Sequence, residues 1–171
     1  IHGGAHHFVM PPGVHFIKFI ATGSGGTGEP SVGGAGATGI GYLSAGPGTV
    51  FAITPGEAPV QANGQNGNPT IIATASGAGS VTLVTAGGGE LDATSSADFT
   101  DNPHVLNGIS VPGSRGRDGF SSTGRGTTTR GGSSYWGSAP APGGGQGETG
   151  NDGDRGFGTY PGPGIVVLEY N

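Results

Sequence analysis

Acidic side chains gather in one stretch of the chain and are the first candidates for chemistry. Glu90, Asp92, Asp98 and Asp101 stand close together in the sequence. Two carboxylates at a suitable separation can cleave a glycosidic bond, one acting as the acid and the other as nucleophile or base. The same residues also suit a solvated polar loop, and no local pattern pairs a nucleophile with a base. The sequence therefore favours the loop, and we predict no catalytic residue.

Histidines cluster at the start of the chain, at His2, His6 and His7. Imidazoles this close in sequence can bind Zn²⁺ or Ni²⁺, but the same pattern fits an ordinary surface segment. The chain contains no cysteine, so thiolate metal sites and disulfides are excluded. These three histidines are weak metal candidates, and no cofactor is predicted.

One glycine motif has the form of a nucleotide-binding fingerprint. Residues 23–28 spell G-x-G-x-x-G after a predicted strand. In a dinucleotide-binding fold this motif must open a helix whose N-terminus faces the pyrophosphate. Glu29-Pro30 and the glycines after it cannot form that helix. We therefore attribute the match to the abundance of glycine.

Aromatic and arginine side chains in glycine-rich loops are the main candidates for binding. Trp, Tyr and Arg are the usual energetic anchors of protein interfaces, and aromatic faces also stack on sugars. A large ring in such a loop either fills a thin core or forms a binding surface, and the sequence leaves both open. The candidates are Phe99, His104, Arg115, Arg117, Phe120, Tyr135, Trp136, Phe157 and Tyr160.

Composition sets the class of protein. The 171 residues include 41 Gly and 13 Pro, and only 10% are charged. Disordered chains usually carry high net charge and few apolar residues, whereas this chain has a net charge of −5 and apolar runs at both ends. Its six basic residues argue against nucleic-acid and anionic-membrane partners. No apolar run approaches the ~18 residues of a membrane span. A chain of 171 residues usually forms one domain, and we expect one ordered domain over residues 1–171.

Runs of apolar and β-branched residues predict an all-β fold. Residues 8–20 have the pattern of a strand, a Pro-Gly turn and a second strand covered on both faces, and the terminal strands are expected to pair in one sheet. No segment predicts an α-helix, although residues 90–99 suit a helical turn or two. The other predicted strands are 49–54, 70–75, 80–85 and 164–170.

Several glycines recur at every third position. Gly33, Gly36 and Gly39 do so, as do Gly113, Gly116 and Gly119, and the longest run covers residues 144–156. A period of three matches polyproline-II geometry, which has no internal hydrogen bonds and needs partners on neighbouring segments. We therefore expect a small β-sandwich of terminal and central strands with polyglycine-II-like segments and long loops. Flexible linkers are the alternative.

Five segments carry a recognisable combination of motifs: Phe8–Val14, Ile17–Gly23, Phe51–Glu57, Gly131–Ser134 and Pro161–Tyr170. Together they resemble the glycine-rich domain at the C-termini of many phage tail-fibre proteins. The resemblance covers most of the chain. It departs from the family pattern in residues 90–112, which contain less glycine, and in the His-rich start. The period-three runs are also similar to the polyglycine-II sandwich of separate adhesins that cap some T-even-like phage fibres.

The resemblance implies a fibre tip on the virion that faces outward and binds a bacterial surface receptor, either polysaccharide or outer-membrane protein. The rest of the tail fibre would be its other partner, either in a homotrimer or as a single copy on a trimer. It implies no catalytic residue and no membrane insertion. One alternative is an ice-binding or structural glycine-rich protein, to which Thr127-Thr128-Thr129 point. The other is a polysaccharide-degrading tailspike that uses Glu90, Asp92 or Asp98.

Overall fold

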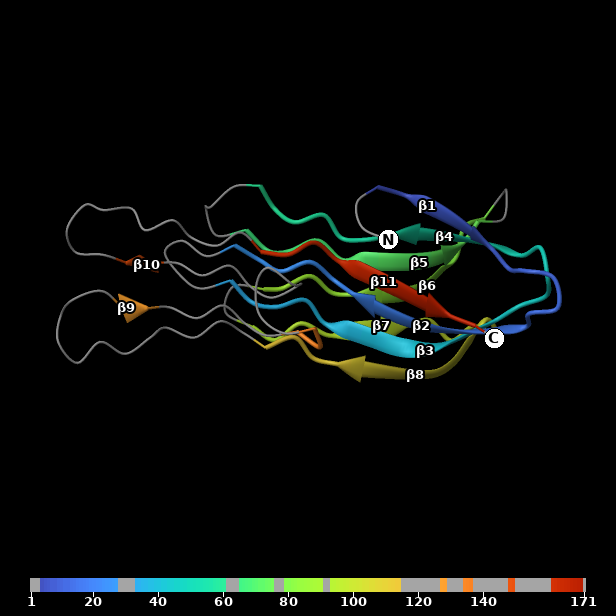
Figure 1. Ribbon diagram of the computed structural model, residues 1–171. Coiled ribbons are helices and arrows are strands. Elements are labelled where there is room, and N and C mark those ends of the chain that lie inside the picture. The colour runs from blue at the N-terminus through green and yellow to red at the C-terminus, as the bar shows by residue number, and fades with distance from the viewer. Residues whose placement is uncertain are drawn as a thin grey trace.

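The structure is a computed structural model that describes residues 4–27, 33–60, 65–75, 79–90, 93–114, 127–128, 134–136, 148–149 and 161–170. These residues form strands, turns and extended segments, with no α-helix among them. Two antiparallel sheets pack face to face and continue at one end into a set of extended glycine-rich segments (Figure 1). The predicted all-β fold is confirmed.

The larger sheet has five strands and the smaller has four. The five-stranded sheet has the order β1-β4-β5-β6-β7, and the four-stranded sheet has the order β11-β2-β3-β8. Two short strands, β9 (Thr127–Thr128) and β10 (Glu148–Thr149), pair with each other. The bounds of the strands in the two sheets are β1 His6–Val9, β2 Phe16–Thr22, β3 Thr38–Ser44, β4 Val50–Thr54, β5 Thr70–Thr74, β6 Thr82–Ala86, β7 Ala97–Phe99, β8 Val105–Val111 and β11 Ile165–Glu169.

The two ends of the chain meet in the four-stranded sheet. β11 pairs antiparallel with β2, so that Val167 lies opposite Ile20 and Glu169 opposite Lys18. This confirms the predicted pairing of the terminal strands. The Pro12-Gly13 turn, where Gly13 has a φ of 78°, separates β1 from β2 as predicted. The two strands nevertheless belong to different sheets, because β1 pairs with β4.

The core fills the space between the sheets. Alternate residues of β2 face inward, so Ile17 and Phe19 are fully buried, and Phe51 and Ile53 of β4 meet them from the other sheet. Other large and fully buried apolar side chains of this layer are Met10, Leu43, Ile72, Leu83 and Val84. Because the inner faces carry the apolar residues, the outer face of the four-stranded sheet presents Phe16, Lys18 and Tyr42.

The glycine-rich segments are joined by backbone hydrogen bonds with a period of three. In the segment 23–27, the N–H groups of Gly23 and Gly26 both donate to segment 33–37, at 3.0 and 2.9 Å. Those of Ser24 and Thr27 both donate to segment 65–68, and that of Gly25 donates to Gly162. Residues i and i+3 thus bond to the same neighbour, as three residues per turn require. Figure 1 shows these segments leaving the same end of the sheets side by side.

Close approach of the backbones explains why glycine occupies this bundle. A methyl group on Gly36 would collide with the carbonyl oxygen of Gly23, and one on Gly89 with that of Gly34. Of the run that starts at Gly33, Gly36 lies in this backbone-bonded bundle and Gly39 lies in β3. Of the run at 113–119 only Gly113 lies within the described residues, where it bridges to Ser95. The glycines of the run at 144–156 lie outside them.

Some strands differ from the sequence prediction. Residues 97–99, expected in a helical turn, form β7 at the edge of the five-stranded sheet. β3 and β8 were not predicted because glycines and asparagine interrupt their apolar pattern. The strands at 50–54, 70–74, 82–86 and 165–169 lie where they were expected. Among the described residues no helix is long and apolar enough to span a membrane.

Candidate functional site

The pair Tyr135 and Trp136 lies on the outer face of the four-stranded sheet. The two rings pack edge to face, with centroids 5.1 Å apart and an interplanar angle of 89°. Such a pair gains about 0.5–1.5 kcal/mol beyond the area that it buries. Tyr135 is 52% exposed and Trp136 is 37% exposed. Two large rings are therefore fixed against each other while much of their surface stays in contact with solvent.

A buried polar network holds Trp136 in place. Its indole Nε1 donates a 2.8 Å hydrogen bond to Oγ1 of Thr22, which is fully buried. The Thr22 hydroxyl also bonds to that of Thr38 at 2.8 Å, across the β2–β3 pair. On the backbone side, Thr70 Oγ1 donates to the Thr22 carbonyl at 2.7 Å. The position of the indole is thus tied to both sheets and not to its own loop alone.

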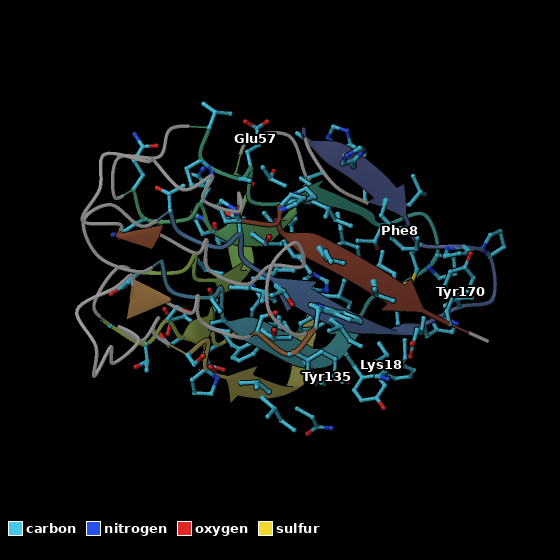
Figure 2. All side chains as sticks on the ribbon, turned by 60° about the vertical axis from the view of Figure 1, so that its left-hand side comes forward. Phe8, Lys18, Glu57, Tyr135 and Tyr170 are labelled. Carbon is cyan, nitrogen blue, oxygen red and sulfur yellow. The ribbon has the colours of Figure 1, made fainter. Side chains whose placement is uncertain are left out.

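An ion pair lies further along the same face. Lys18 Nζ is 2.8 Å from Glu169 Oε2, and the two residues are direct partners in the β2–β11 register. The hydrogen bond to Glu169, together with its negative charge, raises the pKa of Lys18 above its ordinary value of 10.5. Desolvation lowers the pKa of Lys18, and Tyr42, its cross-strand partner, and Tyr135 raise it. Figure 2 shows Lys18 and Tyr135 close together over this sheet.

A groove of about 800 Å³ opens beside this ion pair. Tyr170 closes it at the end of β11 and also contacts Phe8 of the other sheet, with ring centroids 6.3 Å apart. Phe16, Tyr42 and Tyr170 are 59%, 43% and 52% exposed. We call this feature the aromatic groove; it is lined by Phe16, Lys18, Tyr42, Leu168, Glu169, Tyr170 and the turn residues 13–15.

The aromatic pair and the aromatic groove share one surface. Trp136 is attached at Thr22, and Lys18 lies four positions earlier in β2, about 13 Å along the strand. Residues 18, 20 and 22 point to the same face, since side chains alternate along a strand. A ligand that spans a few ångströms can reach one part, and an extended polymer can reach both.

Two predicted anchors, Phe99 and His104, are half-buried and contact the core. Phe99 packs against the core, 6.4 Å from Phe19 by ring centroids, and its ring fills the space over Gly108. His104 Nδ1 lies 2.7 Å from the carbonyl oxygen of Ser44, and its ring packs edge to face on Phe51. Both residues therefore contribute to the scaffold through these contacts, and their role in binding stays a prediction.

The remaining predicted residues are separated from this surface or lie outside the described part of the chain. Glu90 and Asp98 are exposed on different segments. His6 and His7 are successive residues of β1 and so point to opposite faces. Within the described ranges no cluster of three or more His, Asp or Glu could hold a metal. Residues outside the described ranges are His2, Asp92, Arg115, Arg117, Phe120, Phe157 and Tyr160.

Sequence reasoning did not find the aromatic groove. Its residues come from β2, β3 and β11, which are distant in sequence, and Tyr42 belongs to a strand that was not predicted. One signal was available: if the terminal strands pair antiparallel, Lys18 and Glu169 can lie opposite each other as a cross-strand ion pair.

Comparison of the sequence with protein-family models and with curated proteins finds no match.

Proposed function

We propose that this chain is the receptor-binding tip of a phage tail fibre, a domain that attaches the virion to a bacterial surface receptor and performs no chemical step. The observation that carries the proposal is the exposed Tyr135–Trp136 pair, held by a hydrogen bond to the buried Thr22. Exposed and rigid aromatic anchors lose little conformational entropy on binding. Such residues dominate the energy of many interfaces.

The scaffold supports this proposal. Two packed sheets and a bundle of backbone-bonded segments hold the binding surface without cysteine. The segments of the fibre-tip resemblance at the two chain ends and at residues 51–57 coincide with β1, β2, β4 and β11, which form the framework of both sheets. A framework of this kind permits variation in the connections, where binding residues concentrate.

Binding of the purified, fluorescently labelled domain to a panel of bacterial strains tests the proposal. We expect saturable binding to some strains and none to others. Trp136→Ala and Tyr135→Ala should each weaken binding about tenfold or more, as residues at the centre of an interface do. Val81→Ala is the matched control, because Val81 is exposed beside β6 in the other sheet.

Folding must be separated from binding in this experiment. Circular dichroism should show the same strand signal for the wild type and the three variants. Failure to bind any strain in a broad panel would count against the fibre-tip assignment. Undiminished binding by both folded aromatic variants would remove the Tyr135–Trp136 pair from the receptor site.

A further inference from the structure

The aromatic groove combines two kinds of chemistry in one place. Phe16, Tyr42 and Tyr170 present partly exposed rings, and Lys18 and Glu169 form an ion pair between them. Its volume of about 800 Å³ falls within the range of small-molecule sites, ~300–1,000 Å³. Phe16 and Tyr42 lie on the outer face of the sheet, whereas Tyr170 packs on Phe8.

The charge of the groove limits its ligand. Lys18 is already neutralised by Glu169 at 2.8 Å, so an anion gains no net attraction and meets the carboxylate. A cation gains from the ring faces but is repelled by the ammonium group. The mutual neutralisation of Lys18 and Glu169 therefore favours a ligand without net charge.

The hydrogen-bonding capacity of the ion pair is only partly used. An ammonium group has three donors and a carboxylate has about four acceptor sites. Their mutual bond occupies one of each, and both side chains stay accessible, at 39% for Lys18 and 54% for Glu169. Adjacent donors and acceptors of this kind match the vicinal hydroxyl groups of a sugar ring, whose C–H face packs on aromatic rings.

We infer that the aromatic groove binds a neutral hexose unit of a glycan. One face of the sugar would lie on Tyr42 or Phe16, and neighbouring hydroxyls would accept from Lys18 and donate to Glu169. The inference rests on the proposed function only for the origin of the glycan, the bacterial surface. Because the groove is open, affinity for one unit is expected to be weak, on the order of millimolar.

A nuclear magnetic resonance titration of the full chain tests the inference. The probes are the methyl glycosides of glucose, galactose and mannose, together with N-acetylglucosamine, and glucuronate is the charged control. At least one neutral sugar should shift the backbone amides of β2 and the end of β11 in a saturable way. Glucuronate should bind at least about tenfold more weakly. No saturable shift up to about 100 mM for any neutral probe, or equal binding of glucuronate, would overturn the inference.

Variants locate the site. Tyr42→Ala and Glu169→Gln should each weaken the titration about tenfold, and Val81→Ala should leave it unchanged. Two variants are used because either alone could disturb folding, which the amide spectrum itself reports. Normal sugar affinity in both folded variants would overturn the assignment to this groove.

Sugar binding and capture of bacteria, both measured on the wild-type domain, separate the hexose site from the proposed function. Sugar binding in the groove without capture of any bacterial strain would refute the proposed function and leave the hexose site in place. Capture of bacteria without sugar binding would refute the hexose site alone.

Discussion

Gly36→Ala should destabilise the domain by about 2–5 kcal/mol, because the polyglycine-like bundle leaves no room for a methyl group. At position 36 that group would collide with the carbonyl oxygen of Gly23 and lie 3.0 Å from its Cα. Both obstacles are backbone atoms, so no rotation of a side chain can relieve the contact. The two segments must move apart.

The magnitude follows from what that movement breaks. The bonds from Gly23 to Ala37 and from Gly26 to Gly34, at 3.0 and 2.9 Å, join the two segments and would stretch first. Overpacking costs about 1–3 kcal/mol, and each lost backbone bond about 1 kcal/mol. Overpacking and the loss of one or both bonds together give the 2–5 kcal/mol, which lowers the melting temperature by roughly 4–20 °C for a domain of this size.

Gly46→Ala is the matched control. A methyl group at Gly46 meets no atom within 4 Å, and the residue does not have a left-handed backbone. Alanine at such a site changes stability by less than about 1 kcal/mol and usually raises it. Urea and thermal unfolding followed by circular dichroism measure both variants. A Gly36→Ala variant as stable as Gly46→Ala would refute the close-packed bundle.

Further predictions concern the described side chains. The Lys18 ammonium should titrate above 10.5, and Glu169→Gln should return it toward that value in a lysine-selective magnetic resonance titration. Because its pKa is raised, the stabilising effect of this ion pair is present below 10.5 and is lost as the pH rises through the raised pKa. Thr22→Val should lower the free energy of unfolding by about 1–3 kcal/mol. It should also increase acrylamide quenching of Trp136, the only tryptophan, because the indole loses its hydrogen bond to Thr22. Phe99→Ala should lower the free energy of unfolding by about 2 kcal/mol or more and leave binding to bacteria unchanged. Weakened binding by a variant that is as stable as the wild type would contradict a packing role for Phe99.

The sequence predicted the features that depend on local pattern. The apolar runs at 50–54 and 165–169 have strand periodicity, and the terminal strands pair as expected. Backbone hydrogen bonds join the described glycine-rich segments, with a period of three in segment 23–27. These features follow from short-range geometry, in which side-chain alternation and the three-residue turn leave a direct mark on the sequence.

Features that depend on distant contacts could not be predicted. Gly41 in β3 is glycine because the Phe19 ring would lie 2.9 Å from a methyl group there. Asn107 in β8 has a φ of 54° at an irregularity in the β3–β8 register, so its strand has no regular alternation. Whether Phe99 fills the core or faces a ligand likewise depends on Gly108, which is nearby in the fold but belongs to another strand.

The emission of Trp136 reports on receptor binding, because this residue is the only tryptophan of the chain and lies in the proposed receptor site. The purified domain is titrated with cell-envelope fragments from a strain that it binds and from one that it does not bind. We expect a saturable blue shift and protection from acrylamide with the first strain only. Unchanged emission with fragments of a strain that demonstrably captures the domain would contradict it.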